Sequence, residues 1–101
     1  MGWPVVLTPQ AQDDLREIVS YIARNSADRA RRFGNTLVDQ ALSIEIFPEM
    51  GQVVFEVGEP SVREIIHGSY RIIYDLRHDP NAVFVLRFWH RARGTLDTSV
   101  F

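Results

Sequence analysis

The sequence predicts an α+β fold, in which an N-terminal edge strand and a helical hairpin pack on a small antiparallel β-sheet. In the first half of the chain, apolar residues recur at helical spacing, whereas in the second half they fall into short β-prone runs. Two of these runs are separated by only two residues of hairpin-turn type. With 101 residues, 46% hydrophobic and 24% charged, residues 1–101 are expected to form one globular domain.

The chain begins with a short apolar segment, residues 3–7. Pro4 disfavours a central strand, so this segment is predicted to be an edge strand. Thr8 is expected to cap the helix that follows, and Pro9 suits its first position because the missing N–H is not needed there. The residues expected to form one buried face of this helix are Ala11, Leu15, Ile18 and Ile22.

A second helix is predicted to begin after Ser26, its N-cap, and to end before Pro48. Its apolar face is expected to consist of Ala30, Phe33, Leu37, Ala41 and Ile44. Because the connection between the two helices is very short, they are expected to fold back as an antiparallel hairpin. Leu15, Ile22, Phe33 and Leu37 are predicted to be buried between this hairpin and the sheet.

Three strands are predicted after the helices, at residues 62–67, 70–77 and 83–90. Gly68-Ser69 and Asp79-Pro80-Asn81 are the expected turns, and residues 53–57 are expected to add a short strand. Simple alternation places Tyr70, Ile72, Tyr74 and Leu76 on the face toward the helices. It also places Phe84, Leu86 and Phe88 on one face of the last strand, and Val83, Val85, Arg87 and Trp89 on the other.

The second face of this sheet mixes apolar and charged residues and is predicted to bind another chain. The residues expected to bind there are Arg71, Ile73, Val83, Val85, Arg87 and Trp89. An apolar strip bordered by arginines suits an amphipathic, acidic segment that folds as it binds. Trp89 is expected to be the central aromatic anchor. The alternative is that a second copy of the chain covers this face in a homodimer.

The charge distribution argues against extensive contact with nucleic acid. The net charge is −2, and all basic residues are arginine, five against nine acids in residues 1–60 and six against four in residues 61–101. Proteins that contact many phosphates usually carry a clear basic excess. The chain has no cysteine, no apolar run long enough to cross a bilayer and no signal-peptide pattern. We therefore expect a cytoplasmic protein without cofactor or bound metal.

The ordered pattern of residues resembles the RelE/ParE family of toxins from bacterial type II toxin–antitoxin systems. The matching residues are Thr8-Pro9-x-Ala11-x-x-Asp14-Leu15-x-x-Ile18-x-x-Tyr21-Ile22-Ala23, Pro48-x-x-Gly51, Val62-Arg63-Glu64, Gly68-Ser69-Tyr70-Arg71-Ile72-Ile73-Tyr74 and Val85-Leu86-x-x-x-His90-x-x-Arg93. The resemblance covers about residues 5–93. It implies a cytosolic toxin, of the kind that stabilises plasmids, neutralised by a cognate antitoxin; operator DNA would be contacted only through that antitoxin.

Members of this family differ in activity, and the residues favour one of two. RelE-like members cleave mRNA on the ribosome, which here would use Arg63, Arg71 and Arg93 for phosphate and Glu64 or His90 for proton transfer. ParE-like members inhibit DNA gyrase by binding. The net acidic charge, a tail at 94–101 without Tyr, Lys or Arg, and the ParE-like spacing of Val85, Leu86 and His90 favour the gyrase inhibitor. No catalytic residue is therefore assigned, and a third alternative is a protein-interaction module that has lost its toxicity.

Overall fold

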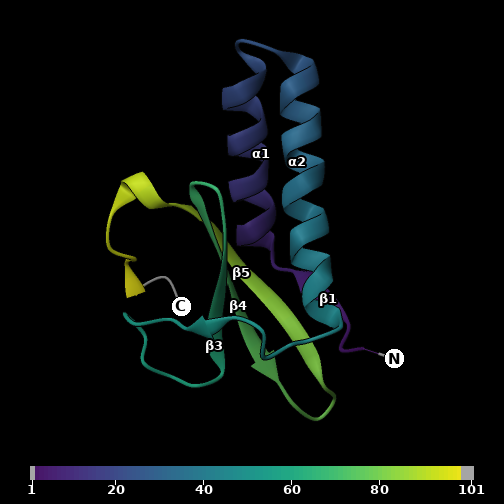
Figure 1. Cartoon of the computed structure of the whole chain (residues 1–101), viewed down its shortest axis with the longest axis vertical. Helices are drawn as coiled ribbons and strands as arrows, with labels where there is room; N and C mark the ends of the chain where they lie inside the picture. The colour runs from purple at the N-terminus through teal and green to yellow at the C-terminus, as the bar shows by residue number, and fades with distance from the viewer. Residues whose placement is uncertain (1, 99–101) are drawn as a thin grey trace.

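The computed structural model describes residues 2–98, which form two helices packed on a five-stranded sheet (Figure 1). The elements are β1 (Val5–Leu7), α1 (Pro9–Ala23), α2 (Ala27–Leu42), η1 (Ser43–Glu45), β2 (Gln52–Val53), β3 (Val62–His67), β4 (Tyr70–Arg77), β5 (Ala82–His90) and η2 (Arg91–Arg93). The strand order is β1-β5-β4-β3-β2. The predicted α+β fold is confirmed. No helix in the described range is long and apolar enough to cross a membrane.

Both predicted helix caps are confirmed. The Thr8 hydroxyl accepts the Ala11 N–H at 3.2 Å, and the Ser26 hydroxyl accepts the Arg29 N–H at the same distance. The second helix ends at Leu42, earlier than predicted, and continues as one 3-10 turn. At this point the Ser43 hydroxyl donates to the Gln40 carbonyl at 2.6 Å, a local bond that competes with helix continuation.

The sheet is mixed rather than purely antiparallel. β1 lies at the sheet edge, as predicted, but pairs in parallel with β5, Val5 opposite Val83 and Leu7 opposite Val85. Parallel neighbours require a long crossover, which the two helices and the other strands provide. The predicted strand at 53–57 is also shorter: β2 covers Gln52–Val53, and the Val54 carbonyl then accepts two turn hydrogen bonds.

The main core lies between the helices and the sheet. Its buried members are Ala11, Leu37, Ala41, Ile44, Ile72, Tyr74, Leu76, Val83, Val85 and Phe88. Of the four residues predicted to be buried between the hairpin and the sheet, Leu37 has no exposed surface, whereas Leu15, Ile22 and Phe33 are half-buried. Figure 1 shows the reason, since the far end of the hairpin extends beyond the sheet and leaves part of its inner face uncovered.

Candidate functional site

A β-bulge in β5 changes which predicted binding residues share a face. Ile73 pairs with Arg87 but Tyr74 pairs with Val85, so Leu86 is an extra residue between them. An extra residue reverses the alternation of side chains beyond it. Val83 and Val85 therefore lie in the core beneath the helices with Phe88, whereas Trp89 belongs to the other face. The predicted common face for Val83, Val85 and Trp89 was wrong, as was that for Phe84, Leu86 and Phe88.

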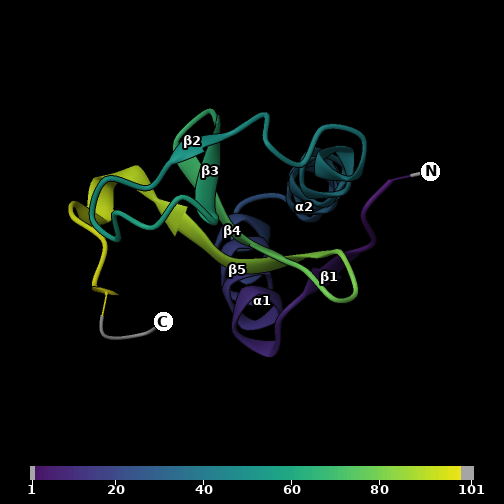
Figure 2. The same cartoon turned by 90° about the horizontal axis from the view of Figure 1, so that it is seen from below.

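The other face of the sheet is covered by the chain itself. Ile73 and Trp89 form a second buried cluster with Val54, Val62 and Leu96, in which Ile73 has no exposed surface and Trp89 is 4% exposed. Figure 2 shows the loop between β2 and β3 and the C-terminal segment together on the side away from α2. Another chain was predicted to cover this face, but in the structure residues of the same chain pack on Ile73 and Trp89.

Arg71 is held by two glutamates on this covered face. Its guanidinium donates to Glu64 at 2.6 and 3.0 Å and to Glu56 with two bonds of 2.8 Å. All three side chains are at most 13% exposed. The hydrogen bonds from Arg71 lower the pKa of Glu56 to about 2, and the two carboxylates raise the pKa of Arg71. Glu56 also accepts the Leu96 N–H at 2.9 Å, so the same cluster fastens the C-terminal segment.

Arg87 forms a second buried ion pair, with Asp14 of α1. Its guanidinium donates to the two carboxylate oxygens at 2.7 and 2.9 Å, and both side chains are 8% exposed. Asp14 also accepts the Phe88 N–H at 3.0 Å. Because β1 ends opposite Val85, this N–H lies beyond the last paired strand residue, and the carboxylate replaces the missing strand. The sequence pattern contains Asp14 but gives no sign of this pairing, because its partner lies 73 residues away.

The residues named for a nuclease are brought together only in part: Arg71 hydrogen-bonds Glu64 and pairs across strands with Trp89, which Arg93 contacts, whereas Arg63 and His90 lie apart. Arg63 lies opposite Tyr74 and His90 opposite Tyr70, so about 13 Å of strand separates their positions along β4. Arg93 is stacked on Trp89, with its guanidinium carbon 3.9 Å from the ring centroid. The arginine at position 71 is engaged by carboxylates, as described above.

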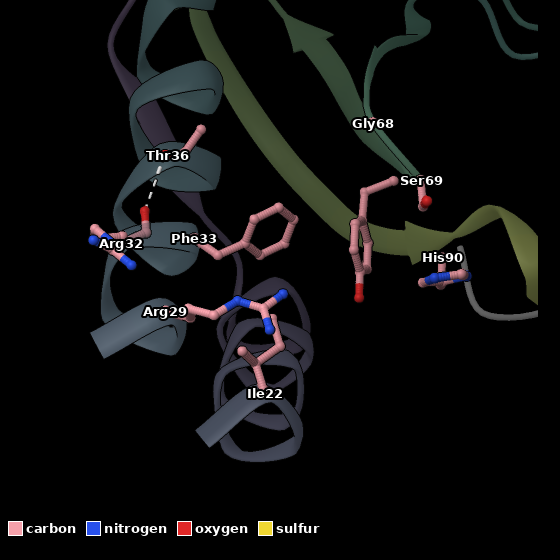
Figure 3. Close-up of a pocket in the computed structure, with 9 residues that line it drawn as sticks. Ile22, Arg29, Arg32, Phe33, Thr36, Gly68, Ser69 and His90 are labelled. Atoms are coloured by element: carbon pink, nitrogen blue, oxygen red, sulfur yellow. Dashed lines mark hydrogen bonds between the residues drawn. The ribbon is translucent and has the colours of Figure 1, made fainter. Parts of the chain in front are cut away.

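A cleft with polar and aromatic walls lies where the hairpin projects beyond the sheet (Figure 3). It has a volume of about 540 Å³ and is lined by Ile22, Arg29, Arg32, Phe33, Thr36, Gly68, Ser69, Tyr70 and His90. Most of these residues were missed or assigned to the core. The spacing of Arg29 and Arg32, three apart on α2 beside Phe33, was the available signal, since it places both arginines on one side of a helix.

A match to one family model covers most of the chain. The family model described as "ParE toxin of type II toxin-antitoxin system, parDE" matches residues 5–94. No curated protein matches the chain.

Solved structures share the fold at low sequence identity. The chromosomal ParDE toxin–antitoxin system from P. aeruginosa has a TM-score of 0.70 and 16% identity, covering 87% of this chain and 95% of that one. The toxin–antitoxin complex RelBE2 from Mycobacterium tuberculosis has a TM-score of 0.67 and 21% identity, covering 90% and 100%. A double mutant of the E. coli toxin RelE in the free state has a TM-score of 0.65 and 17% identity, covering 93% and 88%. The family match spans nearly the whole chain, and the protein belongs to the ParE toxin family of type II toxin–antitoxin systems.

Proposed function

We propose that this protein is a cytoplasmic toxin that inhibits DNA gyrase by binding it, and that a cognate antitoxin neutralises the toxin. The observation that carries the choice of gyrase over mRNA is the placement of Arg71. A ribonuclease needs cations free to stabilise the charged phosphorane. Here both edges of the Arg71 guanidinium are engaged by Glu56 and Glu64, in a cluster that also holds the C-terminal segment.

Two further observations support binding rather than cleavage. Arg63, a candidate for phosphate contact, and His90, a candidate for proton transfer, are separated along and across the sheet. The net charge of −2 also gives little general attraction to ribosomal RNA. An antitoxin partner is supported by the family and by the ParDE and RelBE2 systems of similar fold.

One binding role remains a prediction, and it would require part of the chain to move. The residues predicted to bind are Arg71, Ile73, Val83, Val85, Arg87 and Trp89. In the isolated chain these residues are buried or engaged in ion pairs. A partner could reach Ile73 or Trp89 only after displacing the loop at residues 54–57 and the segment around Leu96.

The decisive experiment measures both activities on the same purified toxin. We expect inhibition of gyrase supercoiling in vitro, and filamentation with DNA-damage signalling when the toxin is expressed without antitoxin. The control is a translation reaction in which mRNA integrity is followed on ribosomes, where no toxin-dependent cleavage is expected. Codon-specific mRNA cleavage with normal supercoiling would reject gyrase as the target and establish the ribosome instead.

A further inference from the structure

An apolar patch is exposed on the segment between η1 and β2, which Figure 1 shows running from the end of α2 toward the sheet. Ile46 is 68% exposed, Phe47 69% and Met50 52%. Together with Pro48 and Glu49 they line a hollow of about 420 Å³, and these residues are called the 46–50 patch below. Single exposed apolar side chains are ordinary on a protein surface, but large neighbouring ones around one hollow indicate a contact surface.

Hydrogen bonds to the body of the protein fix the backbone of this patch. The buried Tyr74 hydroxyl donates to the Pro48 carbonyl at 2.8 Å and accepts the Gly51 N–H at 3.0 Å. The Arg63 guanidinium donates to the Gly51 carbonyl at 2.9 Å. The apolar side chains are therefore presented by an anchored turn, and less conformational entropy is lost when a partner covers them.

The charges beside the patch are negative. Residues 33–62 contain five acidic residues and no arginine, lysine or histidine. Glu45 directly precedes the patch and Glu49 lies within it, and both are exposed. Within residues 2–98, Glu45 forms no ion pair and Glu49 approaches only Arg63, at 3.9 Å. The 46–50 patch thus combines an apolar centre with a negative rim that the chain itself barely compensates.

This combination discriminates between kinds of partner. Nucleic acid and anionic membrane surfaces are repelled by a negative rim. A second copy of the chain is disfavoured, because a two-fold contact through this patch would bring the same glutamates of both copies together. A protein surface with an apolar centre bordered by lysine or arginine matches the patch in both properties. An enzyme that acts on DNA carries basic surfaces of this kind, because it must contact many phosphates.

We propose that the 46–50 patch is the surface through which the toxin docks on a basic surface of gyrase. The inference rests on the gyrase inhibition proposed above and adds where on the toxin the contact is made. Ile46 and Phe47 provide the apolar contact that slows dissociation, and Glu45 and Glu49 speed and orient association. Unlike the covered sheet face around Trp89, this patch is accessible without displacement of the loop at residues 54–57.

The test measures binding of purified toxin to purified gyrase, together with inhibition of supercoiling. We expect Ile46→Ala/Phe47→Ala to weaken gyrase binding about 30-fold and to raise the inhibitory toxin concentration by a similar factor. The matched control is Phe55→Ala, which removes the same kind of side chain from a 91% exposed position on the turn after β2. This control should stay within about twofold of wild type, because lone exposed apolar residues contribute little.

A second pair of variants tests the negative rim. Glu45→Gln/Glu49→Gln should weaken gyrase binding about fivefold at about 50 mM salt and less at about 200 mM, because salt screens exposed charges. Asp13→Asn/Glu17→Gln removes the same net charge from exposed positions on α1 and should stay within about twofold of wild type. Equal weakening by both pairs would reflect net charge alone and would overturn the role of the rim. Thermal unfolding verifies that these variants of exposed positions keep the fold.

The outcomes separate this inference from the one on which it rests. If wild type neither binds nor inhibits gyrase, the proposed function fails and the docking site with it. If wild type inhibits gyrase and the alanine variant inhibits it equally well, the docking site alone is overturned. Loss of antitoxin binding or of self-association in that variant, with gyrase binding unchanged, assigns the patch to that other partner. A weakened alanine variant beside an unchanged glutamine variant overturns the basic character of the surface that the patch meets.

Discussion

Replacing Asp14 by alanine should destabilise this protein more than its position on a helix surface would suggest. Arg87 and Asp14 are each 8% exposed and share two hydrogen bonds, and Asp14 also accepts the Phe88 N–H. Removing one partner of a buried ion pair typically costs about 3–5 kcal/mol, because the remaining charge is left without compensation. The unsatisfied backbone N–H adds to this, so we expect a loss of about 4 kcal/mol.

Urea denaturation measures this loss directly. For a domain of this size, an m-value of about 2 kcal/mol per molar implies that the midpoint falls by about 2 M. The control is Asp13→Ala, next in sequence but 67% exposed and paired only with Arg16, which should change stability by less than about 0.5 kcal/mol.

Two further variants separate charge from hydrogen bonding at this site. Asp14→Asn keeps an oxygen for the Phe88 N–H but removes the charge, and should lose about half as much as Asp14→Ala. The double variant Asp14→Leu/Arg87→Leu should recover much of the loss, since an apolar pair leaves no buried charge. A loss below about 1 kcal/mol for Asp14→Ala would refute the reasoning and indicate that water reaches Arg87.

Two other predictions follow from the loop contacts. The pKa of Glu56 is lowered from 4.5 to about 2, so its stabilising contribution is complete above pH 4.5 and is lost as the pH falls through 2. Between pH 5 and about pH 2, the free energy of unfolding measured in urea should therefore fall by on the order of 3 kcal/mol more for wild type than for Glu56→Gln. Gly51→Ala should cost about 2–3 kcal/mol in the same assay, because a Cβ there would lie 2.5 Å from the Glu64 carbonyl and 2.6 Å from the Tyr74 hydroxyl; a change below about 0.5 kcal/mol would show that the loop can move away.

The features that the sequence predicted correctly are those encoded within a few residues. Thr8 with Pro9, and Ser26, specify helix starts through local hydrogen bonds, and the bounds of β3 and β4 follow from the turn at Gly68-Ser69. The class of fold also followed, since it depends on the order of helical and strand periods rather than on any single contact.

The features that could not be predicted depend on contacts between distant residues. Nothing near Leu86 marks it as a bulge, because residues 82–90 are uniformly β-prone and contain neither Gly nor Pro. One extra residue was enough to move Val83 and Val85 from a predicted binding face into the core. Likewise, the pairing of Arg71 with Glu56 across 15 residues depends on the path of an irregular loop.

The arginines show why charge counted along a sequence can point to the wrong surface. Residues 61–101 carry the basic excess, yet Arg71 and Arg87 from that half are neutralised by buried carboxylates. Residues 1–60 have an acidic balance, yet they provide Arg29 and Arg32, which have no carboxylate partner in the described chain. A partner responds to charges that are exposed and uncompensated at short range, since screening limits distant ones. The uncompensated positive charge of Arg29 and Arg32 therefore lies on the helical hairpin and not on the sheet face that the arginine count favoured.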